Sequence, residues 1–397
     1  MLKGSPMLKR TLTLASLSVV VAIGCSSAPD GASNPNPSSP NGSNDPGGGK
    51  DASVPSADGG SAANDSGVTP PAQDGGAPAA DSGGAQASQW LRTQGNHILL
   101  GNANWHGRGA NLHDPRSCGA CAGAPNAQEV NRRMDELVGW GANFIRLVLE
   151  SQSVQEMVTQ NPTYLSQIQQ IVAHAAAKPG VYVMLSLWVD PTFTALGWPS
   201  NPGTLAEWKT LATTFAKEPR VLFGLVNEPQ SNYDHSLDGQ VWTAMNDVVS
   251  AIRTAEVAAG GQSHVVAVQG TGGWARFLDY YVQHPITAGG GANVAYEVHV
   301  YDPASTFAAR FQNPSKTLPV IIGEFGPAQG YMTLSDCQSL MASAEQLEIP
   351  HLAWTFHMRC PPNLLVDNSG GGCGVNMQLT PTQDWGVPFK ARLSQAW

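Results

Sequence analysis

Two glutamates follow apolar runs in a way that suits a pair of reacting carboxyl groups. Glu228 comes after the run 221–226 and Asn227. Glu324 ends a second run, 319–324. Such a pair can cleave a glycosidic bond, because one carboxyl group protonates the departing oxygen while the other attacks the anomeric carbon. A separation of about 5 to 5.5 Å between the two groups leads to retention of configuration at that carbon.

This chemistry requires the two carboxyl groups to differ in protonation. We expect Glu228 to hold its proton and Glu324 to be ionised, because the negative field of Glu324 raises the pKa of Glu228. The alternative is that each glutamate forms a salt bridge within a loop. That alternative can account for one such residue, but it accounts much less well for two residues that each end an apolar run.

Other polar and aromatic residues stand at similar strand ends. Arg146 interrupts an apolar run and needs a buried carboxylate partner, for which Glu324 is the natural candidate. His299 and Tyr301 alternate and therefore share one face of a strand, from which Tyr301 can donate to Glu324. Trp354 offers an apolar face on which a sugar ring can stack, although a lone tryptophan is as often a packing residue.

The elements that position these residues alternate between strand and helix. Strands are expected at 105–112, 143–149, 181–187, 221–226, 264–269, 294–301, 319–324 and 351–356, after a short hairpin over 90–100. Helical periodicity is expected at 127–140 and from near Tyr164, Leu205, Gly239, Trp274, Ser305, Leu334 and Trp385. Eight such pairs favour a closed (βα)8 TIM barrel over a doubly wound sheet, and barrel active sites lie at the carboxyl ends of the strands.

In order and spacing, these residues resemble glycoside hydrolase family 5, the cellulase family. The resemblance rests on Arg146, Asn227-Glu228-Pro229, His299-x-Tyr301, Glu324-Phe325-Gly326 and Trp354. It implies a (βα)8 barrel with Glu228 as acid/base and Glu324 as nucleophile, and with Asn227 bonding the hydroxyl beside the anomeric carbon. One position departs, since Trp188 stands where many members have histidine. Mannan-cleaving relatives also lack that histidine, so the departure weakens the case for an ordinary endocellulase.

The first 88 residues predict export rather than a folded domain. Basic residues precede the uncharged stretch 11–24, which has the length of a signal-peptide core and is too short to span a bilayer. The stretch ends in Ala22-Ile23-Gly24-Cys25, which resembles a lipobox, so 1–25 is expected to be a lipoprotein signal with Cys25 lipidated. Ordinary signal cleavage is the alternative. Residues 26–88 have too few large apolar residues to fold and predict a linker to one catalytic domain, 89–397.

We therefore expect the protein outside the cytoplasm, at a bacterial cell surface or outer membrane, or secreted. In that compartment cysteines favour disulfides over a zinc site. The candidates lie in the first and eighth loops, which are adjacent in a closed barrel: Cys118, Cys121, Cys360 and Cys373. Their connectivity stays open. Cys337 falls within a helical pattern and is expected to be a buried free thiol.

The net charge of −9 and the lack of basic runs after residue 10 argue against a nucleic-acid partner. We find no nucleotide motif and no convincing metal set, so no cofactor and no metal are expected. The expected partner is a β-linked polysaccharide, with membrane contact only through the N-terminal lipid and the chain as a monomer. The expected activity is endo-β-1,4-glucanase. Alternatives are a β-mannanase, another β-glucanase, a transglycosylase, or a non-catalytic carbohydrate-binding surface protein.

Further candidates for substrate contact are aromatic or polar residues near predicted loops and strand ends. They are Trp105, Asn111, His113, Trp188, Trp198, Trp274 and Tyr331. Of the aromatic residues, Trp188 and Trp354 have the best-supported positions, and the others could equally be packing residues.

Overall fold

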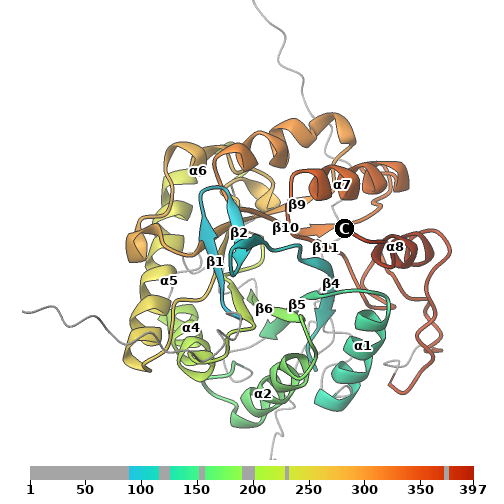
Figure 1. Ribbon diagram of the computed structural model, residues 1–397, viewed down its shortest axis with the longest axis horizontal. Coiled ribbons are helices and arrows are strands. Elements are labelled where there is room, and N and C mark those ends of the chain that lie inside the picture. Colours follow the sequence, from blue (N-terminus) through green and yellow to red (C-terminus); the bar gives the residue numbers. More distant parts are fainter. Residues whose placement is uncertain (1–88, 116–125, 152–156, 190–201, 229–231, 371–374) are drawn as a thin grey trace, which may run out of the picture. The chain divides into compact units, whose positions relative to one another are not determined.

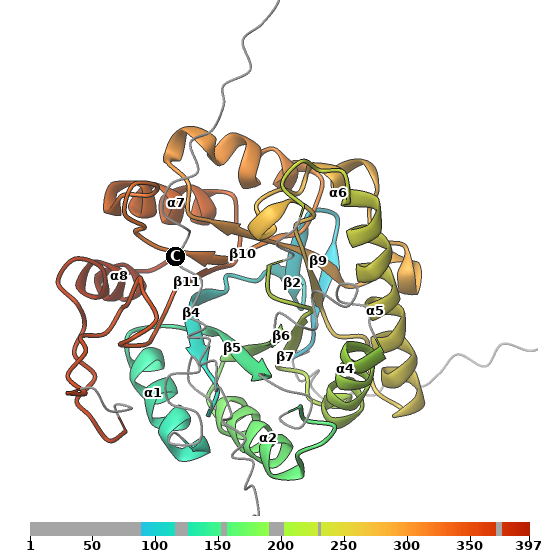
Figure 2. The same ribbon diagram turned by 180° about the vertical axis from the view of Figure 1, so that it is seen from behind.

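The computed structural model describes residues 89–115, 126–151, 157–189, 202–228, 232–370 and 375–397. Within these ranges eight parallel strands close into a barrel in the order β10-β11-β4-β5-β6-β7-β8-β9, with helices arranged around it (Figures 1 and 2). The strands are β4 (Arg108–His113), β5 (Phe144–Ser151), β6 (Tyr182–Val189), β7 (Val221–Gly224), β8 (Val266–Gln269), β9 (Val294–Val300), β10 (Val320–Phe325) and β11 (His351–Ala353). The predicted TIM barrel is confirmed, and the predicted strand ends differ from the observed ones by up to three residues.

The outer helices follow the prediction in most of the eight connections. They are α1 (Ala127–Gly139), α2 (Pro162–Ala176), α4 (Pro202–Phe215), α5 (Asp238–Ala258), α6 (Asp279–Gln283), α7 (Leu334–Gln346) and α8 (Gly386–Leu393). Two connections differ from the prediction. After β8 the chain forms a 3-10 turn, η3 (Gly273–Ala275), and the five-residue α6 instead of a full helix. After β9 it forms the short turns η5 (Ala304–Thr306) and η7 (Pro314–Lys316) around a π-helical segment, η6 (Ala308–Gln312).

Side chains at the amino ends of the long helices explain where those helices begin. Asn126 accepts a hydrogen bond from the backbone of Glu129 and so caps α1. Asn161 caps α2 in the same way, immediately before a proline. Thr333 and Asp336 form a reciprocal capping box at α7. Each cap satisfies backbone donors that have no partner inside the helix. Among the described residues, no helix has both the length and the apolar character needed to cross a membrane.

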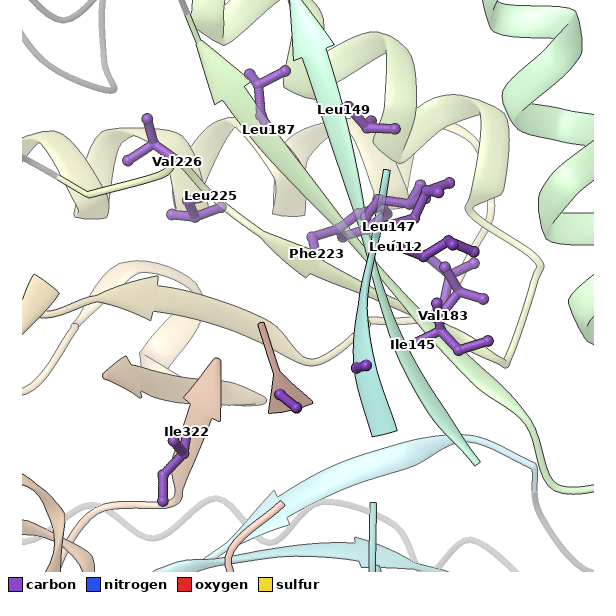
Figure 3. Packing of buried hydrophobic residues seen from close by; sticks show 14 of the residues in the cluster. Leu112, Ile145, Leu147, Leu149, Val183, Leu187, Phe223, Leu225, Val226 and Ile322 are labelled. Atoms are coloured by element: carbon purple, nitrogen blue, oxygen red, sulfur yellow. The ribbon is translucent and has the colours of Figure 1, made fainter. Parts of the chain in front are cut away.

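β5 shows how both faces of a barrel strand are buried. Ile145 and Leu147 belong to the hydrophobic cluster between the strands and the helices (Figure 3). Phe144 and Val148 alternate with them and pack in clusters on the inward face. Arg146 lies between Phe144 and Val148 on that inward face, because successive side chains of a strand point to opposite sides. The strand thus places one cation inside an otherwise apolar barrel.

The end of the barrel where the strands begin is closed by apolar side chains. The predicted hairpin is present as β1 (Leu91–Gln94) and β2 (His97–Leu100). The short β3 (Ala103–Asn104) follows and pairs with β2. Trp105 contacts Phe144 and Tyr182 edge to face, at ring-centroid distances of 4.8 and 5.3 Å. Trp105 therefore lies in the apolar floor of the barrel, and its interpretation as a substrate-binding aromatic residue is wrong.

Residues 1–88 lie outside the described residues, and with them the predicted signal, the lipidated Cys25 and the linker. Those interpretations stay predictions.

We expect Trp105→Ala to lower the free energy of unfolding by about 3 to 5 kcal/mol, because it leaves a cavity in the barrel floor. Activity per folded molecule should stay close to that of the wild type, since the side chain is remote from the carboxyl ends of the strands. Denaturant unfolding and kinetics measure both effects. Trp242→Ala, which removes a partly exposed indole from α5, is the control and should cost less. A raised KM at unchanged stability would contradict the assignment of Trp105 to the floor.

Candidate active site

The polar residues of the barrel interior converge above the apolar floor: Arg146 comes from within β5, Glu228 from just after β7, and His299 and Glu324 from near the carboxyl ends of β9 and β10. Arg146 and His299 are fully buried, and Glu228 and Glu324 are nearly so, at 7% and 4% exposure. One oxygen of each of these carboxylates and a ring nitrogen of His299 lie within 4.8 Å of one another. This spacing is close to the separation that leads to retention of configuration in glycoside cleavage.

Arg146 organises this cluster through its planar guanidinium group. Nη1 donates to Glu324 Oε1 and to Asn111 Oδ1, both at 2.8 Å. Nη2 donates to Asn227 Oδ1 at 2.9 Å. Nε forms an ion pair with Glu297 Oε1 at 3.0 Å. Arg146 thus has the carboxylate partner that its sequence position requires. Asn111 is one of its hydrogen-bond acceptors and lies inside the barrel instead of at the rim of a cleft.

Glu324 receives donors on both of its oxygens. Arg146 binds Oε1, and the Tyr301 hydroxyl donates to Oε2 at 3.0 Å. Burial and the negative charge of Glu228 raise the pKa of Glu324, while His299, Arg146 and Tyr301 oppose that rise. Ionisation of Glu324 therefore depends on the donors that surround it.

A β-bulge turns Glu324 into the barrel. Ile322 pairs with Val298, but Glu324 pairs with His299, so Gly323 is an extra residue in β10. Ile322 packs outward against the helices, and an unbroken strand would point Glu324 the same way. The bulge shifts the alternation by one residue, as bulges beside active sites commonly do. Asn111 Nδ2 donates to the Gly323 carbonyl at 2.9 Å and satisfies the bulged backbone.

Glu228 lies in an uncommon backbone conformation just after β7. Its φ is +46°, in the left-handed region that side chains other than glycine rarely adopt. The backbone N–H of Glu228 donates to Gln269 Oε1 at 2.6 Å, so a side chain of β8 holds this conformation in place. Strained backbone of this kind costs of order 1 to 3 kcal/mol and gathers at functional sites.

His299 lies between two carboxylates. Nδ1 is 2.8 Å from Glu228 Oε1, and Nε2 is 3.2 Å from Glu297 Oε1. Burial alone would lower the pKa of His299, but the charge of Glu324 and the bonds to Glu228 and Glu297 outweigh burial and raise that pKa to about 9. A pKa of this size favours the imidazolium form at neutral pH, in which Nδ1–H can donate to Glu228 and Nε2–H to Glu297.

Two tryptophans form one side of the site. Trp354 and Trp188 lie with ring centroids 5.8 Å apart, in a cluster that also contains Val148, Cys360 and Tyr301. Trp354 is almost completely buried and donates through Nε1 to the Cys360 carbonyl at 3.1 Å. The two interpretations of Trp354, as a packing residue and as part of the site, are therefore compatible. His113 is buried against the same indole, at a ring-centroid distance of 5.3 Å.

The structure adds residues that sequence reasoning missed. Glu297 and Gln269 are fully buried beside His299, and Tyr233 lies with its ring 6.3 Å from that of Trp274. Burial and then the negative charge of Glu228 raise the pKa of Tyr233. The alternation of Glu297 with the known candidates on the same strand was the signal available for finding it.

The remaining predicted residues have mixed outcomes. Four of these residues lie outside the described residues: Cys118, Cys121, Cys373 and Trp198. Cys360 is described and buried, and the predicted disulfides stay a prediction. Cys337 is a buried free thiol, as predicted, and burial raises its pKa well above the ordinary value. Tyr331 is 47% exposed and borders a hollow of about 500 Å³ between the loops that follow β9 and β10.

Glu228, His299 and Glu324 are close enough to suggest a metal centre, but their chemistry does not suit one. A protonated His299 has no lone pair to offer a cation. Arg146 already contacts Glu324 at 2.8 Å and would repel a cation at that oxygen. The arrangement is a hydrogen-bonded cluster of carboxyl groups and fixed cations, and it suits proton transfer and nucleophilic attack.

Comparison with known proteins agrees with this geometry. The model of the cellulase family, glycosyl hydrolase family 5, matches residues 100–359. The chain belongs to this family. The family 5 resemblance seen in the sequence is thereby confirmed. Family 5 is a family of glycosyl hydrolases.

The relatives extend the comparison. Endoglucanase 1 of Saitozyma flava is 26% identical over 243 residues, which cover 56% of this chain and 65% of that relative. The catalytic domain of a Thermobifida fusca endoglucanase superposes with a TM-score of 0.59 at 18% identity, over 77% of this chain and 97% of that one. A β-mannanase from Streptomyces thermolilacinus superposes with a TM-score of 0.53 at 20% identity, over 77% and 98%. At such identities the structural likeness shows the fold alone.

We expect Gly323→Ala to disrupt the site, because an added Cβ would lie 2.0 Å from Glu297 Oε1. The clash should displace the bulge, reduce kcat by at least about 100-fold through misplacement of Glu324, and cost about 1 to 3 kcal/mol of stability. Kinetics and thermal unfolding measure the two losses. The control is Gly139→Ala in α1, where an added Cβ meets nothing within 4 Å. Normal kcat in Gly323→Ala would show that the bulge does not orient Glu324.

Proposed function

We propose that this family 5 hydrolase cleaves a β-linked polysaccharide with Glu228 as general acid/base and Glu324 as nucleophile. The observation that carries the proposal is the pair of carboxylates within 4.8 Å, with Arg146 and Tyr301 bound to Glu324 and His299 bound to Glu228. Donors on both oxygens favour the anionic form of Glu324, which a nucleophile requires. Glu228 has one charged donor and is the better candidate for the group that gives and takes a proton.

In the first step Glu228 gives its proton to the glycosidic oxygen while the bond from that oxygen to the anomeric carbon breaks. Glu324 Oε1 or Oε2 attacks the same carbon from the opposite face and forms a covalent glycosyl ester. In the second step the ionised Glu228 takes a proton from water, and the water oxygen displaces Glu324. Two inversions give net retention. Asn227, held by Arg146, is positioned to bond the hydroxyl beside the anomeric carbon.

As the substrate we propose β-1,4-glucan, cleaved within the chain by endo action. The alternative substrates are β-mannan and other β-glucans. The endoglucanase relatives and the two tryptophans support a glucan, since indole faces stack on sugar rings. A negatively charged chain also suits a neutral polymer. Trp188 in place of a histidine and the mannanase of like fold support the first alternative. A transglycosylase, in which a sugar hydroxyl replaces water in the second step, is a further alternative.

Activity of the full chain toward β-1,4-glucan, mixed-linkage glucan, β-mannan, β-1,3-glucan and xylan tests this proposal. We expect release from one polymer class, and a loss of at least about 10⁴-fold in Glu324→Ala. Azide with an aryl glycoside then separates the two roles. In Glu324→Ala, azide should occupy the face that Glu324 attacks and give an inverted glycosyl azide. In Glu228→Ala it should attack the glycosyl ester and give a retained one.

Reversal of those two stereochemical outcomes would exchange the assigned roles. Folded wild-type protein that binds one polymer and releases sugar from none would instead support a carbohydrate-binding function. Glu256→Ala, which removes a buried carboxylate at the other end of the barrel, controls for loss of activity through instability.

We also propose that the chain is exported and held at a membrane by lipid on Cys25, with 26–88 as the linker to the barrel. The signal-like stretch and the lipobox-like sequence support this. In a bacterial host, Cys25→Ala should abolish labelling by radioactive palmitate and move the protein out of the membrane fraction, while Ser26→Ala should change neither. Unchanged labelling of Cys25→Ala would rule out lipid at this position.

A further inference from the structure

A third carboxylate lies directly beneath the reacting pair. Glu297 is fully buried, and its Oε1 contacts both Arg146 Nε, at 3.0 Å, and His299 Nε2, at 3.2 Å. Glu297, His299 and Tyr301 alternate along β9 and its end, so they point into the barrel at three successive heights. Arg146 contacts Glu324 and His299 contacts Glu228, and one oxygen atom of Glu297 contacts both of these cations from deeper in the barrel.

The backbone of β10 is shaped to admit this carboxylate. A Cβ on Gly323 would lie 2.0 Å from Glu297 Oε1 and 2.6 Å from Glu297 Cδ. Only a residue without a side chain leaves this space, and the same residue forms the bulge that turns Glu324 inward. Glu297 thus packs against the bulge, and its position is coupled to that of Glu324.

With one proton on the pair Glu228 and Glu324, the charges of the buried cluster balance only when Glu297 is included. Arg146 and His299 carry two positive charges. Glu297 ionised, together with one ionised and one protonated carboxyl in the pair Glu228 and Glu324, carries two negative charges. A buried cluster with an uncompensated charge is strongly unfavourable. Neutrality therefore coincides with the state that the reaction requires, in which the pair holds a single proton.

We propose that Glu297 is a positioning residue that keeps His299 charged and Arg146 in place, and thereby keeps one proton on the catalytic pair. This inference rests on the proposed roles of Glu228 and Glu324. Glu297 acts through His299 and Arg146, since it lies below both. It is a carboxylate whose function is to fix the charge state of the two carboxylates above it.

The titration of the groups agrees with this geometry. Burial alone would raise the pKa of Glu297, but Arg146 and His299 outweigh burial and lower it, so Glu297 is ionised. His299 lies against Glu297 of its own strand, Gln269 of β8, Glu324 of β10 and Glu228 after β7. The charged and titratable groups next to these are Arg146 of β5, which contacts Glu297 and Glu324, and Tyr301 after β9, which donates to Glu324. Removal of one negative charge from this set lowers the pKa of every acid that remains.

The test is Glu297→Gln in the full chain, which keeps the shape of the side chain and removes its charge. We expect both limbs of the pH profile of kcat/KM, measured on the polymer that the wild type cleaves, to move to lower pH by about 1 unit. On the alkaline limb the activity should fall about tenfold. Glu297→Asp, which restores the charge, should return both limbs toward the wild-type values.

The chain offers a matched control in a second buried carboxylate between an arginine and a histidine. Glu256 contacts Arg253 Nη1 at 2.8 Å and His264 Nδ1 at 2.7 Å. His264 precedes β8, so this cluster lies at the barrel end remote from the catalytic pair. Glu256→Gln should lower thermal stability to a similar extent as Glu297→Gln and leave both limbs where they are. If Glu297→Gln lowers kcat/KM at every pH without moving either limb of the profile, the role of Glu297 is structural only.

A second measurement does not depend on activity. The His299 imidazole can be followed by NMR in ¹⁵N-histidine-labelled protein, where its signal is the one absent from His299→Gln. We expect it to titrate near pH 9 in the wild type and at lower pH in Glu297→Gln. An unchanged midpoint would overturn the inference. If the wild type cleaves no polymer, the proposed function fails, and this titration still decides what Glu297 does to His299.

Discussion

Arg146 carries a full positive charge inside the barrel, with no exposed surface. A buried guanidinium group is stable only where acceptors and anions surround it, because it has lost its solvation. Here the acceptors come from β4, the end of β7, β9 and β10: Asn111, Asn227, Glu297 and Glu324. One cation therefore ties strands on opposite sides of the barrel to a common geometry. Loss of either carboxylate would leave the guanidinium group with an unbalanced charge.

The apolar floor makes this polar layer possible. Trp105, Phe144 and Tyr182 interlock at the end where the strands begin, and the hydrophobic cluster between strands and helices encloses the barrel. The free energy gained by burying these apolar side chains offsets the cost of burying the polar residues in the layer above them. In that layer the local conformations are costly: Glu228 has a positive φ, and β10 carries a bulge. Each is held by a hydrogen bond with a side chain of another strand: the Glu228 N–H donates to Gln269 of β8, and Asn111 of β4 donates to the Gly323 carbonyl.

The same enclosure strengthens the electrostatics on which the proposed chemistry depends. In a site walled by Trp354 and Trp188, charges interact at low effective dielectric, and the surrounding carboxylates raise the pKa of His299 to about 9 despite its burial. Preorganised donors of this kind do not need to reorient as charge develops during the reaction. The fold therefore provides both the positions of the reacting groups and their protonation.

The sequence by itself determined the barrel, the pair Glu228 and Glu324, and the convergence of Arg146 and Tyr301 on Glu324. Those inferences needed only the alternation of apolar runs and the fact that parallel strands present their carboxyl ends at one edge. Side-chain direction needed the tertiary structure. The period of two in an unbroken β10 would point Glu324 toward the helices, and only the bulge at Gly323 turns it inward. The roles of Glu297 beneath the pair and of Trp105 in the floor were likewise decided by packing, because depth within a barrel depends on strand register, which a linear pattern does not contain.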